Sequence, residues 1–258
     1  MPDLPLTTLL ALSLVSLVAG FIDAISGGGG LISLPALMLA GLSPAQALAT
    51  NKLQALFGKL SSVRYFLKQG LIAPGKLKLP LLLCFGFSAL GALAIQRLSS
   101  EVLQLWLPWM IVAVALYVLL SPRLGDLDTR QRIPPLLFGL LVVPLLSFYD
   151  GFFGPASGSF FAIGFIALLG HNTAKATAHA KLFLLVSNAA ALGAFILGGQ
   201  VAWSVGIAMA CGQWIGARYG SQLVHLKGNK LVKPMLLLVS TLLVLKLALL
   251  DGGVMPWL

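Results

Sequence analysis

Two polar breaks in an otherwise apolar chain hold the residues that could do chemistry. Residues 21–31 contain the carboxylate of Asp23, one serine and a run of consecutive glycines. Residues 148–159 repeat this pattern and place Asp150 where the first break has Asp23. Glycine lets a backbone approach a ligand closely, and a broken helix frees N–H and C=O groups that hydrocarbon cannot satisfy. We therefore expect both breaks to face protein or a water-filled cavity.

The helix that restarts after each break is expected to favour an anion. Near Leu31 and near Phe160 it presents unpaired N–H groups and the positive end of a helix dipole. The predicted substrate contacts within the breaks are Gly28, Gly29, Ser157 and Gly158.

Two lysines occupy equivalent places after the breaks. Lys52 and Lys181 each lie just before, or within, an apolar stretch that is too short to span a bilayer without them. A lysine at bilayer depth costs about 2.5–3.5 kcal/mol or more, so it normally faces a cavity or a partner. Two such lysines would give an anion site two fixed positive charges. The alternative is a loop lysine whose ammonium group reaches the membrane interface.

Polar neighbours extend this lysine face. Lys59 follows Lys52 by two helical turns, and Asn188 follows Lys181 by the same spacing. Three residues that precede the lysines could donate hydrogen bonds to an oxyanion or could be ordinary polar residues of a helix N-terminus: Thr50, Asn51 and His179. The histidine could also couple transport to a proton, or could be a hydrogen-bonded structural group.

Three roles compete for Asp23 and Asp150, since an intramembrane carboxylate is a functional candidate by default. Each could take up a proton during transport, pair with a lysine across the site, or accept hydrogen bonds from the N–H groups of the broken backbone. We favour the last, structural role, because each aspartate precedes its matching glycine, Gly27 or Gly154, by one helical turn.

The composition places these residues in a membrane. Of 258 residues, 59% are hydrophobic and 9% are charged, whereas a soluble domain would be about a quarter charged. About ten apolar stretches follow one another, and six suit a spanning helix of about 20 residues. Stretches 31–42 and 160–169 are too short, and 53–67 and 182–197 cross only if the polar residues before them lie at membrane depth. The sequence predicts an all-α polytopic protein of the plasma membrane, in bacteria the inner membrane.

The charge and cysteine patterns exclude several other classes of protein. The net charge of +10 does not indicate a nucleic-acid partner, because the basic residues lie in short loops between apolar runs. No Cys/His spacing suggests a metal site, and no nucleotide-binding motif is present. We expect no cofactor; the expected partners are a small anion and the lipid bilayer, and a homo-oligomer stays open.

The sequence also predicts an internal repeat, with residues 1–125 as its first copy and residues 126–258 as its second. Residues 43–53 match 172–182, and we expect Ser43 and Asn172 to cap the helices that begin there. About five apolar segments in each half make the repeat inverted, so that the two halves enter the membrane from opposite sides. If the two short segments did not cross, eight spans and parallel halves would result.

Loop charge supports the inverted arrangement. Basic residues concentrate in one set of loops, which the positive-inside rule places in the cytoplasm: 68–78, 121–132, 171–181 and 218–233. Inverted halves with short, Gly-interrupted segments in matching positions are typical of secondary transporters with a midplane site.

With these motifs in view, the chain resembles the TauE/SafE family of sulfite-exporter-like membrane proteins, and within it the YfcA-type members. The resemblance covers nearly the whole length and rests on residues 20–30, 49–54, 148–159 and 175–181. It implies an integral plasma-membrane transporter whose substrate is an anion such as sulfite or an organosulfonate.

The predicted function is secondary transport of a small anion, a sulfur oxyanion or organosulfonate, by alternating access, and not an enzymatic reaction. A passive anion channel is one alternative. The other is an intramembrane serine hydrolase with Ser157 and His179 as its dyad. The first half has Gly30 and Thr50 at the matching positions, so the repeat does not preserve that chemistry.

Overall fold

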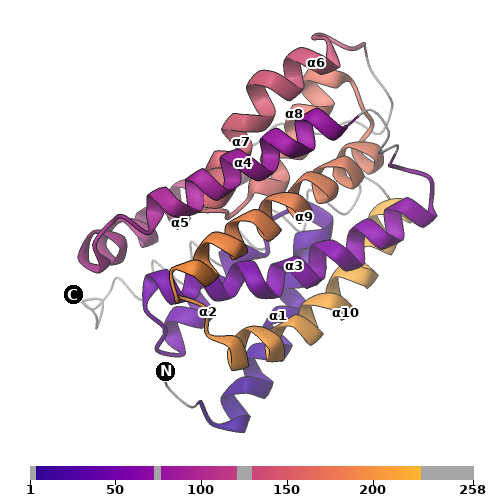
Figure 1. The fold of residues 1–258 in the computed structure, drawn as a ribbon. Coiled ribbons are helices and arrows are strands. Elements are labelled where there is room, and N and C mark those ends of the chain that lie inside the picture. The colour runs from indigo at the N-terminus through magenta and orange to yellow at the C-terminus, as the bar shows by residue number, and fades with distance from the viewer. Residues whose placement is uncertain (1–3, 73–76, 121–129, 228–258) are drawn as a thin grey trace.

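The computed structural model describes residues 4–72, 77–120 and 130–227, and all the regular structure in those ranges is helical (Figure 1). The elements are α1 (Leu6–Ser26), α2 (Gly30–Leu39), α3 (Pro44–Lys68), α4 (Lys78–Ile95), α5 (Ser100–Leu120), α6 (Pro135–Leu137), the π-helical turn η2 (Phe138–Val142), α7 (Val143–Phe152), α8 (Ser157–Leu169), α9 (Thr173–Leu197) and α10 (Trp203–Lys227). The predicted last segment, 231–250, and most of the basic loop 121–132 lie outside the described residues.

The helices have the length and surface of a membrane protein. Four of them are long and apolar enough to cross a bilayer: Leu6–Ser26, Lys78–Ile95, Pro135–Phe152 and Thr173–Leu197. Their outward faces carry exposed leucines, among them Leu14, Leu82 and Leu145, each more than 60% exposed. Side chains of this kind suit a lipid environment, so the prediction of an all-α polytopic membrane protein is confirmed.

Helices α2 and α8 are short, as the apolar stretches predicted. Their 10 and 13 residues correspond to lengths of about 15 and 20 Å, well below the ~30 Å of a hydrocarbon core. Each follows a break that begins with a glycine at positive φ, Gly27 at 75° and Gly154 at 99°. Glycine adopts this left-handed conformation without the strain that a side chain would cause.

Helices α3 and α9 begin earlier than their apolar stretches. Ser43 caps α3 by accepting a hydrogen bond from Gln46 N, and Asn172 caps α9 by accepting one from Lys175 N. Both predicted caps are thus confirmed, and both helices have 25 residues. The polar residues before the apolar stretches, Lys52 and Lys181 included, consequently belong to the helices.

The helices of the two sequence halves interleave. In Figure 1, α3 and α9 lie at the centre, α10 and α1 on one side of them, and α4 and α7 on the other. Helix α1 packs along α10 of the second half, and α7 packs along α4 of the first half. The described parts of residues 1–125 and 126–258 therefore do not form separate bodies in space.

Glycines allow the closest of these contacts. Gly216 of α10 lies so near α1 that a Cβ atom there would be 1.9 Å from the Leu17 carbonyl oxygen. Gly151 of α7 approaches α4 in the same way, with the Ser88 carbonyl oxygen 1.9 Å from the position of its missing Cβ. Small residues at such contacts let helix backbones pack closely in a membrane, where the hydrophobic effect does not drive helix association.

Candidate substrate site

The two breaks touch each other in the middle of the protein. A Cβ atom on Gly27, at the end of α1, would lie 2.5 Å from the Cα atom of Gly158, at the start of α8. The Ser159 hydroxyl donates a hydrogen bond to the Ser26 carbonyl across the same contact. Residues 27–29 and 155–158 of the breaks are buried, so their backbone groups face protein, as expected.

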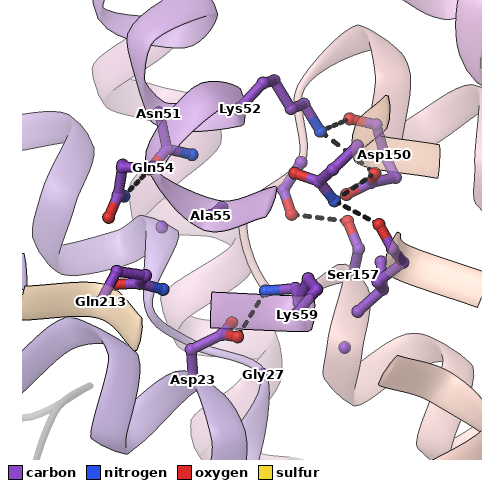
Figure 2. A pocket seen from close by; sticks show the side chains of 15 residues that line it. Asp23, Gly27, Asn51, Lys52, Gln54, Ala55, Lys59, Asp150, Ser157 and Gln213 are labelled. Carbon is purple, nitrogen blue, oxygen red and sulfur yellow. Dashed lines mark hydrogen bonds and ion pairs between the residues drawn. The ribbon is translucent and has the colours of Figure 1, made fainter. Parts of the chain in front are cut away.

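Buried ion pairs cross from each half of the chain to the other. Lys52 of α3 places its Nζ 3.1 Å from Oδ2 of Asp150 at the end of α7, and also bonds the Asp150 carbonyl. Lys181 of α9 places its Nζ 3.1 Å from Oδ2 of Asp23 at the end of α1, and also bonds the Asp23 carbonyl. The two lysines thus make matching contacts with the two breaks (Figure 2 shows the Lys52 contact).

The residues two turns further along α3 and α9 differ from each other and break this symmetry. Lys59 pairs with Asp23 Oδ2 (Figure 2), so that carboxylate meets two ammonium groups. At the matching place in α9, Asn188 donates to Asp150 Oδ2 at 3.3 Å and Ser187 donates to it at 2.5 Å. Asp150 therefore meets one ammonium group and two neutral donors.

The cluster of three lysines and two aspartates has one formal positive charge in excess. Each of the five side chains is almost entirely buried, with exposures of 1–5%. Buried charges need partners, and a carboxylate accepts strong, charge-assisted hydrogen bonds from an ammonium group. Of the three roles considered for the aspartates, pairing with a lysine is the one that agrees with these contacts. Our preference for backbone N–H donors was wrong, because buried ammonium groups need those carboxylates as partners.

A small polar cavity lies beside these pairs (Figure 2). Its volume is ≈ 20 Å³, enough for about one water molecule. Its walls carry both aspartates, Lys52, Lys59 and residues from both breaks, whereas Lys181 is not in the cavity wall. Further polar side chains come from three helices: Asn51, Gln54, Asn188 and Gln213. Charged side chains and the backbone of both breaks therefore line the same cavity, at the place where the breaks meet.

Some of the other predicted substrate contacts line the cavity and some do not. Ser157 and Gly158 line the cavity, as does Asn51, whose Oδ1 accepts hydrogen bonds from Ser33 and Gln54. Gly28 and Gly29 belong to the first break but are not in the cavity wall.

Thr50 and His179 lie away from the cavity. Thr50 Oγ1 accepts a hydrogen bond from the Ala202 N–H at the start of α10. The Nδ1 atom of His179 bonds the Lys175 carbonyl, and its ring packs against Phe165.

The groups of the alternative Ser–His dyad also have other partners. Ser157 Oγ donates to the Gly154 carbonyl at 2.5 Å, and the Nδ1 atom of His179 is 2.8 Å from the Lys175 carbonyl oxygen. Neither contact resembles an activated nucleophile next to its base.

Two polar residues of the cavity wall were missed at the level of sequence, Gln54 and Gln213. Both are buried, and within the described part of the chain the Oε1 atom of each has no hydrogen-bond partner. Signals for both existed: Gln54 follows Lys52 within one helical turn, and Gln213 is an amide inside an apolar stretch. Buried polar groups normally have partners, so these amides are suited to contact a molecule in the cavity.

Substituting alanine for Gly29 is expected to destabilise the protein, whereas the same change at Gly28 is not. A Cβ atom at Gly29 would lie 2.5 Å from Cβ of Asp23 and would push this aspartate away from its lysines. At Gly28 the nearest atom would be 3.7 Å away. We expect Gly29→Ala to cost about 1–3 kcal/mol and Gly28→Ala less than about 0.5 kcal/mol, measured by thermal unfolding of the purified protein. Equal melting temperatures would contradict this packing.

The chain matches known proteins over nearly its whole length. The family model described as "Sulfite exporter TauE/SafE" matches residues 12–247. The "Probable membrane transporter protein YfcA" of Escherichia coli (strain K12) is 48% identical over 246 residues, which cover 95% of this chain and 91% of that protein. No solved structure matches the chain.

Relatives in other bacteria carry similar names. A "Probable membrane transporter protein" of Haemophilus influenzae is 46% identical and covers 95% of this chain and 96% of its own length. The "Probable membrane transporter protein ORF9" of a Sinorhizobium species is 44% identical, with coverages of 96% and 95%. Together with the apolar helices, these bacterial relatives identify a multi-pass protein of the inner membrane. The chain belongs to the TauE/SafE family of membrane proteins.

Proposed function

We propose that this protein is a secondary transporter of a small anion, with sulfite, an organosulfonate or a related sulfur oxyanion as the leading substrates. The observation that carries the proposal is the buried cluster of three lysines and two aspartates beside the cavity. The names of the relatives, which describe membrane transporters and not enzymes, agree with it. The family description adds sulfite as the first compound to test.

The charge balance of the cluster indicates what the site binds. Substrate oxygens can replace the carboxylates as acceptors for the lysine ammonium groups, because sulfonate, sulfite and carboxylate oxygens all accept charge-assisted hydrogen bonds. One excess positive charge suits a substrate with a single negative charge. A sulfonate carries one such charge, and sulfite carries one in its protonated form, hydrogensulfite. A second negative charge would have no further cation within the cluster and would be costly at this depth of burial.

The small volume of the cavity supports transport by alternating access. A cavity of ≈ 20 Å³ has room for about one water molecule, so an anion with several oxygens requires the surrounding helices to separate. We propose that residues 1–125 and 126–258 are inverted repeats, and that the two interleaved groups of helices, α1 with α10 and α4 with α7, move against each other at the two breaks. The crossed pairs, Lys52 with Asp150 and Lys181 with Asp23, support a two-fold relation between them.

Counterflow in proteoliposomes tests this function. We expect saturable uptake of labelled sulfite or of a monoanionic sulfonate such as methanesulfonate, at least about tenfold above that of protein-free liposomes. Sulfate, with two charges, and taurine, whose charges cancel, should compete weakly. Sulfite is kept under anaerobic conditions so that it is not oxidised to sulfate during the assay.

Three outcomes would contradict the proposal. Equal competition by sulfate and by monoanions would overturn the single-charge argument. Uptake that does not saturate and exceeds carrier rates would indicate a channel. An absence of uptake for every anion, with protein shown to be folded by its melting temperature, would contradict anion transport.

A further inference from the structure

A second basic site lies between α3 and α10, away from the buried cluster. It is an open cleft of ≈ 300 Å³ lined by Ser61, Arg64, Lys68, Trp214 and Arg218. None of the lysines or aspartates of the buried cluster lines it. The two helices run parallel here, and the Ser61 hydroxyl donates to the Trp214 carbonyl at 2.9 Å. The cleft is thus part of a close helix–helix contact.

Three cations converge on this cleft. Arg64 and Lys68 are one helical turn apart on α3, and Arg218 reaches the cleft from α10. The guanidinium carbon of Arg218 lies 4.7 Å from the ring centroid of Tyr65, a contact that holds it in place. Among the described residues, no carboxylate lies within ion-pair distance of these three side chains. The cleft therefore presents positive charge that the described protein does not neutralise.

Apolar side chains extend from the cleft along the outer faces of both helices. On α3, Leu60 and Phe57 are 44% and 39% exposed; on α10, Ile215 and Ile207 are 46% and 56% exposed. All four precede the basic residues of the cleft on their own helix, so they lie nearer the helix N-terminus. Because α3 and α10 are parallel, the basic cleft and this apolar surface form one continuous strip.

We propose that this cleft binds the phosphate group of an anionic phospholipid, with its acyl chains lying along the apolar strip. Basic pockets between transmembrane helices on the cytoplasmic side suit such headgroups. The predicted basic segment 68–78 begins at the end of α3, and the predicted basic segment 218–233 includes the last residues of α10, so the cleft faces the predicted cytoplasmic leaflet. A soluble anion would use the charges alone and would leave the strip unexplained.

Lipid titration followed by native mass spectrometry tests the site in detergent-solubilised protein. Phosphatidylglycerol is the anionic lipid and phosphatidylcholine the uncharged reference. We expect phosphatidylglycerol to bind more tightly, and the variant Arg64→Gln/Lys68→Gln/Arg218→Gln to lose about 100-fold in affinity for it, at about fivefold per basic residue. Phosphatidylcholine binding should not change.

The control removes the same charge elsewhere. Lys78, Arg130 and Arg132 are exposed residues in the basic loops 68–78 and 121–132, and their triple glutamine variant should retain wild-type lipid affinity. If the cleft variant unfolds because Arg218 has lost its contact with Tyr65, the double variant Arg64→Gln/Lys68→Gln, both exposed, should still lose about 25-fold.

Three results would overturn the proposal. The first is an equal loss of affinity in the control variant, which would indicate general electrostatic attraction. The second is equal affinity for the two lipids. The third is competition for the cleft by inorganic phosphate or sulfite at concentrations comparable with those of the lipid, which would identify a site for soluble anions.

Discussion

Lys52→Met and Lys181→Met are each expected to reduce substrate uptake at least about 25-fold, and together to abolish it. Both ammonium groups are buried and reach the breaks, where the proposal has them bind the substrate. Losing one partner of a buried, charged hydrogen bond costs about 2–5 kcal/mol, and each 1.4 kcal/mol is a factor of ten in affinity. Lys78→Met, at an exposed lysine at the start of α4, should leave uptake unchanged.

Stability separates the two lysine variants in a way that transport does not. In Lys181→Met, Asp23 keeps Lys59 as its partner. In Lys52→Met, Asp150 keeps only neutral donors, so a buried carboxylate loses its one ammonium partner among the described residues. Breaking a buried pair in this way costs about 3–5 kcal/mol. We therefore expect a larger fall in melting temperature for Lys52→Met than for Lys181→Met.

The double variant Lys52→Met/Asp150→Asn distinguishes folding from transport. It removes both charges of the pair, so its melting temperature should recover toward that of the wild type. Uptake should not recover, since the ammonium group proposed to bind substrate is still missing. Wild-type uptake in the variant that lacks both lysines would refute the site, and recovered uptake in the double variant would give the pair a purely structural role.

Gly216→Ala is expected to prevent the packing of α1 against α10. A Cβ atom at Gly216 would be 1.9 Å from the Leu17 carbonyl oxygen and 2.8 Å from the Phe21 nitrogen, both main-chain atoms that cannot turn aside. Relief requires the two helices to separate along their length, because Gly212 and Gly220 make the same contact one turn before and after. We expect a loss of about 3 kcal/mol or more, at or above the upper end of ordinary overpacking.

Gly193→Ala provides the matched control within α9. A Cβ atom there meets nothing within 4 Å, and alanine in a helix interior is favoured over glycine by about 0.5–1 kcal/mol. This variant should equal or exceed the wild type in melting temperature, while Gly216→Ala should show little folded protein by size-exclusion chromatography. If both variants eluted and melted alike, the close α1–α10 contact would be wrong.

The sequence predicted the class of the fold and the neighbourhood of the site. Runs of apolar residues without charge determine membrane helices almost by themselves, so the all-α polytopic assignment needed no tertiary information. The caps at Ser43 and Asn172 were also predictable, since a cap is a local hydrogen bond between a side chain and the next turn.

Pairing across the fold was not predictable to the same degree. Equivalent positions identified Lys52 and Lys181, but which aspartate each lysine meets depends on how the two halves interleave. The same reason explains Gln54 and Gln213, which lie on different halves and reach one cavity. His179 follows the repeat in sequence, yet its ring packs against Phe165, because it precedes Lys181 by two residues and so lies on a different face of α9.

The crossed ion pairs have a consequence for how the chain is inserted into the membrane. Asp23 and Lys59 are both made early, so these two charges can neutralise each other while synthesis continues. Lys52 has no such opportunity, because its partner Asp150 is made later and arrives with α7. Until then its ammonium group must remain near water or beside the translocation machinery. The lysine of the first half, Lys52, thus gains its buried partner only after the second half has been synthesised.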